Sequence, residues 1–487
     1  MVSCCGSICD QKNCFHVKRR TLNVVVLLYH DTEQFCSLHD KKLAFSDFLY
    51  IFVCKISDNL HIYVLIILNN SSELKMTKKR DLYEKLIKHL DKKECTILTG
   101  ARQVGKTTLL QKMYRDLKAD HDVYFISLEN FSILNDLNSD FENIFKYARR
   151  PANPLLSEKG DRIIIFVDEI QYINNPSNFL KYLFDTYQNN LKIIASGSSA
   201  FYIDDSFQDS LAGRKRVFHL KPLSFSEYLT FKDADELKQE LSRIRSEEHY
   251  LSTFYSDLLH YFNDYLTFGG YPRVALEQDN QEKRALLDEL LNSFLKKDIY
   301  ESKIEQELKF YNLISALSAQ TGQLLNKNEL SNTFGIHQNT ILKYLAVLQK
   351  CFYINVLPPF YQNIRKEITK MPKVYFADLG IRNKLLNRFY PLNEREDKGQ
   401  LLENYVYIRL AEIYDKEQLR YWRTTDKQEV DFVITESYGT GKAFEIKFSD
   451  LKFQKKSFQK FCLTYPAYDL RCVSYDSSGR SIPVLKI

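Results

Sequence analysis

Short apolar runs alternate with longer stretches of helical spacing along most of the chain. From residue 94 onward, four runs rich in β-branched and aromatic residues are separated by amphipathic segments, namely Cys95–Thr99, Val123–Leu128, Ile163–Val167 and Leu191–Ala195. Strands that alternate with helices are typical of a parallel sheet with crossover helices. The pattern therefore predicts an α/β core built on a parallel sheet.

The pattern changes after this core, which we assign to residues 76–225. Residues 226–305 have helical spacing rich in Tyr, Phe and Leu, which predicts a helical lid. Residues 306–360 predict three short helices followed by a strand, in the order of a winged helix. The basic stretch 361–373 is a candidate linker or wing. It opens a last segment, 361–487, whose pattern is mixed α/β.

Residues 1–75 differ from the rest of the chain. They show no sustained period of 2 or 3.6, and they contain six of the ten cysteines. A zinc site formed by Cys5, Cys9, Cys14 and His16 stays open as an alternative, although the spacing fits no paired C-x-x-C frame. We interpret the stretch as an atypical, unstructured extension or as a mis-assigned start, with Met76 as the alternative first residue.

Composition excludes several classes of protein. The chain has 487 residues, 44% of them hydrophobic, so it has ample capacity for buried cores, and 15 Gly and 11 Pro are too few for a disordered chain. No run reaches the ~18 apolar residues of a membrane span, and the start lacks the order of a signal peptide. We therefore expect a cytoplasmic protein without a membrane partner. The net charge of +6 permits nucleic-acid binding without requiring it.

A phosphate-binding motif follows the first core strand. The segment Gly100-Ala-Arg-Gln-Val-Gly-Lys-Thr107 matches G-x-x-x-x-G-K-[ST], and a predicted helix begins at Lys106. Backbone N–H groups in such a loop surround the phosphates of a nucleotide, and the helix N-terminus adds a positive dipole end. We expect Lys106 to contact the β- and γ-phosphates of ATP and the Thr107 hydroxyl to hold Mg²⁺. The predicted nucleotide-binding residues are Gly100, Arg102, Gln103, Val104, Gly105, Lys106, Thr107 and Thr108.

Two acidic residues end the apolar run Ile163–Val167, namely Asp168 and Glu169. A continuous apolar run is typical of a central parallel strand, so Asp168 is expected near the phosphate loop, where it would bind Mg²⁺ through water. Glu169 is placed to polarise the attacking water, which predicts hydrolysis of ATP. Ser196 and Ser198 end the next apolar run. They are expected near the γ-phosphate, or else they form a serine-rich turn.

These strings resemble a known family. LTGARQVGKTTLL, VDEIQ, SGSSA, LAGR, PLSFSEYL and GGYPR occur in this order in AAA-type ATPases of archaea and bacteria, which usually carry a C-terminal domain related to PD-(D/E)xK nucleases. The resemblance covers about residues 78–487 and implies a P-loop core with an additional strand and a catalytic Glu, then a helical lid. It places Gln171 near the γ-phosphate and makes Arg214 and Arg273 candidate sensor or finger arginines. Arg214 would act in cis or from a neighbouring subunit of a homo-oligomer, or it belongs to a solvated basic loop.

A helix-turn-helix is predicted inside residues 306–360. The first helix spans 327–334, Gly335 and Ile336 form the turn, and the second helix spans 337–348 with Leu342, Leu345 and Leu348 on its buried face. The exposed face of the second helix offers side chains that can reach bases or phosphates, namely His337, Gln338, Asn339 and Lys343. DNA is therefore a predicted partner. Alternatively, the motif only packs against other domains.

An acidic constellation lies near the C-terminus. Two runs alternate polar and apolar residues, as strands with one buried face do. Glu429 and Asp431 share one face of the first strand, and Glu445 and Lys447 share one face of the second. Seven residues, 435–441, separate the two strands and favour a hairpin. Asp431 and Glu445 are candidate ligands of Mg²⁺, or of Mn²⁺, and Lys447 would orient a nucleophilic water. By resemblance, Glu403 matches the first acid of the nuclease family. The alternative is a structural cluster of salt bridges.

The expected fold is an α/β P-loop (AAA-type) parallel-sheet core with a helical lid, then a winged helix, then a mixed α/β restriction-endonuclease-like domain. The sequence thus predicts an ATP-binding and ATP-hydrolysing protein that couples turnover through the winged helix to a nuclease-like domain acting on DNA. The alternative is an ATP-gated DNA- or protein-binding switch whose nuclease-like domain is catalytically inert.

Overall fold

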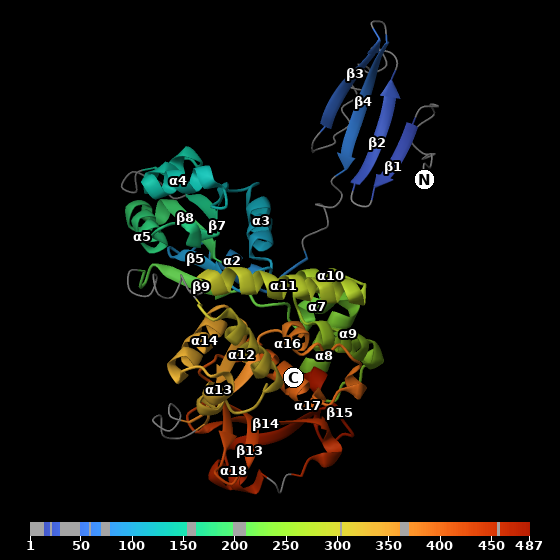
Figure 1. Cartoon of the computed structure of the whole chain (residues 1–487), viewed down its shortest axis with the longest axis vertical. Helices are drawn as coiled ribbons and strands as arrows, with labels where there is room; N and C mark the ends of the chain where they lie inside the picture. Colours follow the sequence, from blue (N-terminus) through green and yellow to red (C-terminus); the bar gives the residue numbers. More distant parts are fainter. Residues whose placement is uncertain are drawn as a thin grey trace. The chain divides into compact units, whose positions relative to one another are not determined.

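The structure, a computed structural model, divides the chain into two compact units, Met1–Lys78 and Lys79–Ile487 (Figure 1). The first unit is described by the backbone of four strands. The second is described over residues 79–152, 162–197, 211–301, 304–360, 370–454 and 458–487.

The first unit contains a four-stranded antiparallel sheet of order β1-β2-β4-β3. Its strands are β1 (Cys14–Arg19), β2 (Leu22–Tyr29), β3 (Leu49–Ser57) and β4 (Leu60–Asn69). The expectation of an unstructured extension is therefore wrong for these residues. Three of these strands, β2, β3 and β4, are largely continuous apolar runs, so a period of 2 does not predict them. The zinc alternative lies outside the described residues and side chains.

The core of the second unit is a five-stranded, fully parallel sheet of order β6-β7-β8-β5-β9. The strands are β5 (Cys95–Thr99), β6 (Asp122–Ser127), β7 (Ile163–Asp168), β8 (Leu191–Gly197) and β9 (Lys215–His219). The predicted parallel core is thus confirmed, and β8 is an additional strand between β5 and β7.

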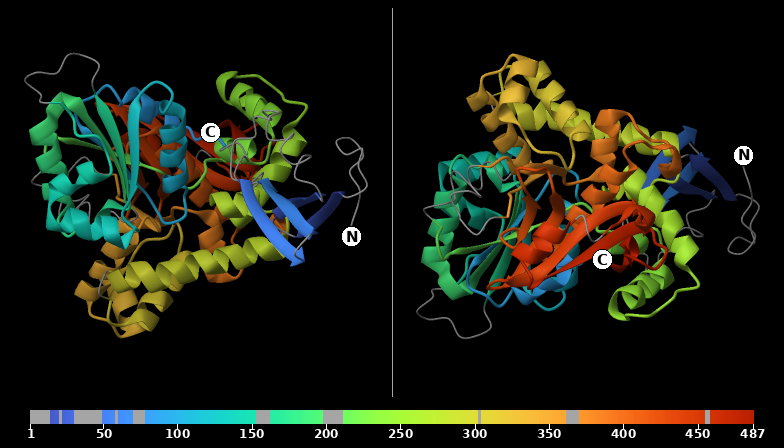
Figure 2. Two further views of the ribbon diagram at one scale, coloured as in Figure 1. Left: turned by 90° about the horizontal axis from the view of Figure 1, so that it is seen from above. Right: turned by 90° about the horizontal axis from the view of Figure 1, so that it is seen from below.

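Helices cover both faces of this sheet, because the central strands alternate their apolar side chains between two cores. Phe166 and Ile194 pack with α2 (Leu82–Lys88) and α3 (Lys106–Leu117), whereas Ile165 and Ile193 pack with α4 (Phe131–Ser139) and α5 (Pro176–Tyr187). The sheet lies between its helices in both views of Figure 2. All six residues of β7 are buried, as a central strand requires.

Five helices follow the core sheet. They are α7 (Phe225–Phe231), α8 (Asp235–Ser246), α9 (Tyr255–Phe268), α10 (Pro272–Leu276) and α11 (Asn280–Glu301). A capping box starts α7, because the Ser224 hydroxyl accepts from the backbone N–H of Glu227 and the Glu227 carboxylate accepts from that of Ser224. The segment predicted to form a lid is therefore helical.

Three helices and two strands come next among the residues that the structure describes. They are α12 (Glu307–Ala319), α13 (Lys327–Phe334), α14 (Gln338–Lys350), β10 (Ile354–Leu357) and β11 (Lys373–Phe376). The two strands are antiparallel, and Leu324 adds a bridge to Lys373. Gly335 ends α13 in the left-handed conformation, at φ +58°. The two helices of the expected helix-turn-helix are thus present, with the second beginning at Gln338.

The C-terminal part has a mixed five-stranded sheet of order β12-β13-β14-β15-β16. Its elements are α16 (Leu379–Leu386), α17 (Lys398–Ile413), β12 (Leu419–Arg423), β13 (Glu429–Ser437), β14 (Thr440–Ser449), α18 (Gln459–Thr464), β15 (Tyr468–Asp476) and β16 (Ile482–Pro483). The β13–β14 hairpin turns over two residues, not seven, because Thr435 pairs with Gly441 and Ser437 with Thr440. β14 and β15 are parallel.

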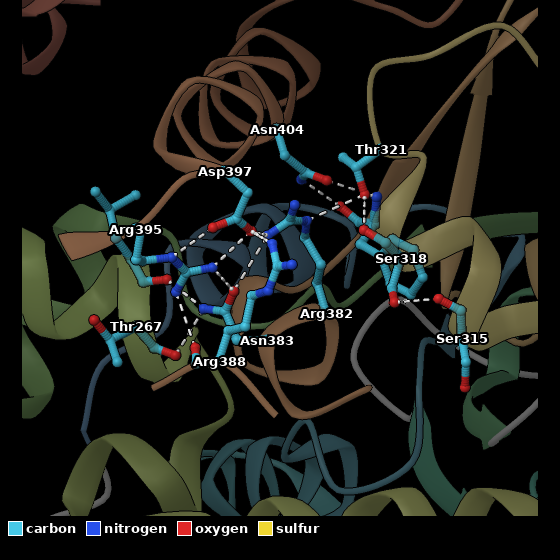
Figure 3. A network of polar contacts seen from close by, with 12 residues as sticks. Thr267, Ser315, Ser318, Thr321, Arg382, Asn383, Arg388, Arg395, Asp397 and Asn404 are labelled. Carbon is cyan, nitrogen blue, oxygen red and sulfur yellow. Dashed lines mark hydrogen bonds and ion pairs between the residues drawn. The ribbon is translucent and has the colours of Figure 1, made fainter. Parts of the chain in front are cut away.

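A buried network of polar side chains connects helix α9 with α16 and with the residues just before α17 (Figure 3). The Asp397 carboxylate accepts from the guanidinium groups of Arg382 and Arg395, each at 2.9 Å. The Asn383 amide donates to the carbonyls of Leu266 and Thr267 at the end of α9. Helix α9 is thereby tied to α16 and to the start of α17.

Candidate functional site

The predicted phosphate loop connects β5 to α3 at the carboxyl edge of the parallel sheet. Gly105 has φ +95°, a conformation that side chains disfavour, so glycine is required at this turn into the helix. The Lys106 ammonium donates to the carbonyls of Gly100 at 2.9 Å and Ala101 at 2.8 Å. The loop thus curls around its own lysine, at the N-terminus of α3.

The acidic residues after β7 lie one strand away from this loop. In the register of the sheet, β8 stands between them, and Leu98 of β5 is opposite Ser196. The Ser196 hydroxyl, which is fully buried, donates to Asp168 and accepts from the backbone N–H of Glu169 at 3.1 Å. The Gln171 amide donates to Glu169. The structure therefore gathers these four predicted residues at one edge, whereas Ser198 lies outside the described residues.

These residues fit a magnesium–nucleotide complex. The loop offers backbone N–H groups and a lysine, which suit phosphates, while the hydroxyl and carboxylate oxygens of Thr107 and Asp168 are the hard ligands that Mg²⁺ prefers. The two sets meet at the carboxyl ends of parallel strands, where α/β proteins bind their ligands.

Helix α10, in the segment predicted to form a lid, also contacts the phosphate loop. Arg273 of α10 donates to the side-chain oxygen of Gln103 at 3.3 Å and pairs with Glu289 of α11 at 3.0 Å. Of the two arginines that the family resemblance implied, this one touches the loop. A nucleotide bound at the loop would therefore lie near Arg273.

Arg214 lies elsewhere. Its backbone carbonyl accepts from Cys95 at the start of β5, and its guanidinium pairs with Asp185 at 2.7 Å. The loop follows Thr99, which pairs with His219, and His219 is five residues beyond Arg214, or about 16 Å along an extended strand. Within one chain Arg214 is thus at the opposite edge of the sheet, which does not fit a finger in cis. A role in trans stays a prediction.

A second arginine at the loop, Arg80, escaped the sequence analysis. Its guanidinium donates to the carbonyls of Val104 at 2.8 Å and Lys221 at 2.7 Å, and to the Glu227 carboxylate at 2.9 Å. Both side chains of the ion pair are 7% exposed. Arg80 therefore braces the phosphate loop against the capping box of α7. Its sequence position, among charged residues at a predicted helix start, gives no such signal.

The acidic residues of the C-terminal sheet surround a lysine. The ammonium of Lys373 lies 3.1 Å from Glu403 Oε1, 2.5 Å from Glu429 Oε1 and 3.3 Å from Asp431 Oδ1. Lys373 is 1% exposed. We call Glu403, Glu429, Asp431 and Glu445 the acidic cluster. Lys373 lies in the basic stretch predicted as a linker or wing, and nothing local marks it as buried, because its partners lie 30 or more residues away in sequence.

Glu445 and Lys447 form the other half of the cluster. Lys447 donates to Glu445 Oε1, while Glu445 Oε2 is buried without a hydrogen-bond partner. The backbone N–H of Ile446 donates to Asp431 Oδ2 at 2.9 Å. Burial, reinforced by the charge of Asp431, raises the pKa of Glu445 to about 8, and burial likewise raises that of Glu403 to about 7. Lys447 thus serves one oxygen of Glu445 and leaves the other oxygen without a donor.

The acidic cluster does not have the geometry of a metal site in this state. Within the described part of the chain, no three His, Cys, Asp or Glu side chains gather closely enough to hold an ion. Lys373 stands between the acids instead. Glu445 Oε2, which has no donor, could accept a cation. Asp431 Oδ1 and Glu403 Oε1, in contrast, already share the Lys373 ammonium.

The second helix of the helix-turn-helix presents a polar surface. His337, Gln338, Asn339 and Lys343 are exposed, and the His337 ring caps the helix by accepting from the N–H of Asn339. Leu342, expected on the buried face, is 44% exposed, because the buried stripe runs through Ile341, Tyr344, Leu345 and Leu348.

Comparisons with known proteins agree with the core geometry. Residues 92–229 match the family model "AAA domain", and residues 259–391 and 398–480 match two domains of unknown function, DUF8612 and DUF4143. An uncharacterized protein of Methanocaldococcus jannaschii is 26% identical over 89% of this chain and 94% of its own length. Another from the same organism is 29% identical over 77% and 80%, and one from Mycobacterium tuberculosis is 26% identical over 76% and 74%.

Solved structures match only weakly. The crystal structure of Cdc6p from Pyrobaculum aerophilum covers 64% of this chain and 96% of that one, at 12% identity and a TM-score of 0.26. The crystal structure of a DNA replication initiation factor covers 69% of this chain and 88% of its own, also at 12% identity and a TM-score of 0.26. At this level of similarity, neither match indicates a role for this chain. No helix in the described residues is long and apolar enough to cross a membrane. The chain thus carries an AAA-type P-loop ATPase domain followed by two segments that match domains of unknown function.

Proposed function

We propose that this protein binds and hydrolyses ATP with Mg²⁺, and that turnover moves the lid and, through a winged helix, a nuclease-like C-terminal domain, on a DNA target. We propose the domains 76–225, 226–305, 306–360 and 361–487 for these four parts. The observation that carries the proposal is the contact of the phosphate loop with the lid, through Arg273 to Gln103 and through Arg80 to Val104 and Glu227.

The residues around the loop have distinct roles in this proposal. Lys106 exchanges its two carbonyl partners for the β- and γ-phosphates, and Thr107 and Asp168 hold the ion that neutralises phosphate charge. Glu169 accepts the proton of the attacking water, while Gln171 and Ser196 fix its position. Ser196 thereby acts as a positioning residue for the acidic pair.

A continuous series of contacts leads from the lid to the C-terminal domain. The backbone N–H of Gly270, two residues before α10, donates to Asp378 at 2.7 Å, and Asp378 caps α16 by accepting from Ile381. Burial raises the pKa of Asp378 to about 6, although these N–H donors oppose the rise. Movement of Arg273 would thus be transmitted to α16 through a few bonded residues.

The described elements support the winged-helix and nuclease-like assignments. Helices α12–α14 are followed by the β10–β11 hairpin, which is the order of a winged helix. The described helices and strands of the C-terminal part run two helices, three strands, one helix and two strands, with acids on α17, β13 and β14. Both assignments are proposals about what these elements do.

DNA binding is tested by measuring the ATPase rate with and without duplex DNA. We expect DNA to change the rate and Lys343→Ala to weaken binding uniformly across sequences, reducing the salt slope of binding by about 1, because one phosphate contact is lost. Lys93→Ala, at an exposed lysine of the ATPase core, is the matched control. Equal rates with and without DNA, together with equal binding by both variants, would exclude this partner.

Metal-dependent DNA cleavage is a second candidate function, favoured by the unpartnered buried oxygen of Glu445 beside Lys447. In an assay of plasmid and linear DNA with Mg²⁺ or Mn²⁺, we expect Lys447→Ala to lower cleavage by about 10²–10³-fold, as for loss of one preorganised electrostatic contact. Equal inactivity of wild type and variant under all conditions would leave the C-terminal domain catalytically inert.

A further inference from the structure

Lys373 belongs to one sheet and neutralises another part of the molecule. It is the first residue of β11, which pairs with β10 and not with the C-terminal sheet. Its ammonium nevertheless reaches Glu403 on α17 and Glu429 and Asp431 on β13, all within 3.3 Å. A single buried ammonium on β11 thus serves three carboxylates on α17 and β13.

The strand that carries Lys373 is held firmly in place. The Tyr375 hydroxyl donates to the same oxygen of Glu403 at 2.6 Å, and the Asn404 side chain bonds both backbone groups of Phe376, at 2.8 and 2.9 Å. On the other side, the N–H of Gly322 donates to the carbonyl of Val374 at 2.9 Å. A Cβ at Gly322 would lie 2.8 Å from Glu403 Oε1, so the fit leaves no room for a side chain.

A divalent ion would compete with this ammonium for the same oxygens. Metal ligation requires oxygens at about 2.0–2.6 Å from the ion, and Asp431 Oδ1 and Glu403 Oε1 already face Lys373. Asp431 Oδ2 is engaged by the backbone of Ile446. Two positive centres at one carboxylate repel each other strongly away from water. Seated Lys373 and a metal bound to Asp431 are therefore mutually exclusive.

We propose that the Lys373 ammonium, supplied by β11, is the resident cation of the acidic cluster, and that the residues present do not fit a divalent ion at Asp431 and Glu403 while this ammonium is seated. The inference rests on the geometry of the cluster and bears on the second candidate function, because metal-dependent cleavage would require the ammonium to leave these two carboxylates. Glu445 Oε2, which has no hydrogen-bond donor, would be a further ligand once the ammonium is absent.

The chain offers an internal probe for this test. Its single tryptophan, Trp422, lies on β12 and pairs with Val430 of β13. Val430 is the residue immediately before Asp431. Terbium luminescence excited through tryptophan therefore reports on an ion at the acidic cluster in the full chain, without DNA. We expect wild type to show no sensitised emission above that of Asp431→Asn. Lys373→Met should gain it, with an apparent affinity for Tb³⁺ at least about tenfold higher, which is about 1.4 kcal/mol.

The double variant Lys373→Met/Asp431→Asn is the control and should lose the gained emission. If Lys373→Met does not fold, Lys373→Met/Glu429→Gln removes one charge of each sign, keeps Glu403, Asp431 and Glu445, and takes its place. Equal Tb³⁺ binding by wild type and the methionine variant, or no gain in either methionine variant, would overturn the proposal. Neither result depends on whether the domain cleaves DNA, so failure of the cleavage assay is distinguishable.

Discussion

Glu169→Gln is expected to lower the rate of ATP hydrolysis by about 10²–10⁴-fold while leaving ATP binding nearly unchanged. The substitution keeps the size of the side chain but removes the group that accepts the proton of the attacking water. Lys106, which faces the phosphates, donates to the carbonyls of Gly100 and Ala101 and is unchanged by the substitution, so the phosphate contacts should survive. Steady-state turnover and equilibrium binding of a labelled nucleotide, measured on the same preparation, check the two halves of this expectation.

Lys106→Ala is the matched comparison for this variant. Its loss removes the charge that faces the phosphates, so both binding and turnover should fall, in contrast to Glu169→Gln. Wild-type turnover in Glu169→Gln would mean that another group activates the water. Wild-type turnover in Lys106→Ala would contradict the phosphate-loop assignment itself.

The phosphate loop was predictable because its geometry is local. A strand, a glycine-rich turn and a helix are consecutive in sequence, and Lys106 bonds carbonyls only five and six residues away. The meeting of Asp168 with Ser196 follows from one further rule, since neighbouring parallel strands end at the same edge. Period 2 was enough to anticipate that Glu429 and Asp431 share a face.

The remaining features depend on packing between distant segments. Arg80 reaches Glu227 across 147 residues, and Lys373 reaches Asp431 across 58. The place of Arg214 follows from the register of β9 against β5, which the motif LAGR does not encode. The exposure of Leu342 depends on which face of α14 the other helices cover. Such contacts obey no spacing rule, because they arise when modules dock.

Two groups of buried charges, one around Lys373 and one around Asp397, are stabilised in the same way. Taking a charge out of water costs several kcal/mol, so it is retained only where carboxylates and hydrogen bonds compensate it. Lys373 is compensated by three acids, whereas Arg382 and Arg395 share mainly one. The second group is therefore the one most sensitive to loss of a single charge.

Asp397→Asn is accordingly expected to reduce the free energy of unfolding by about 3–5 kcal/mol, the cost of leaving buried charge without its partner. The side chains of Arg382 and Arg395 are at most 1% exposed, and that of Asp397 is 3% exposed. Denaturant unfolding of the full chain measures the loss. Arg388→Ala is the control, because this arginine is 39% exposed, lies 3.6 Å from the carboxylate, and should cost less than about 1 kcal/mol.

The same carboxylate predicts a dependence of stability on pH. Burial alone would raise the pKa of Asp397, but hydrogen bonds from Arg395 and the charge of Arg382 outweigh it and hold that pKa well below its usual range. A depressed pKa stabilises the fold above the unfolded value of about 3.9 and loses this contribution as pH falls below it. Wild type should therefore lose more stability than Asp397→Asn on acidification below about pH 4. Parallel losses in the two proteins would show that Asp397 does not carry the charge that the arginines require.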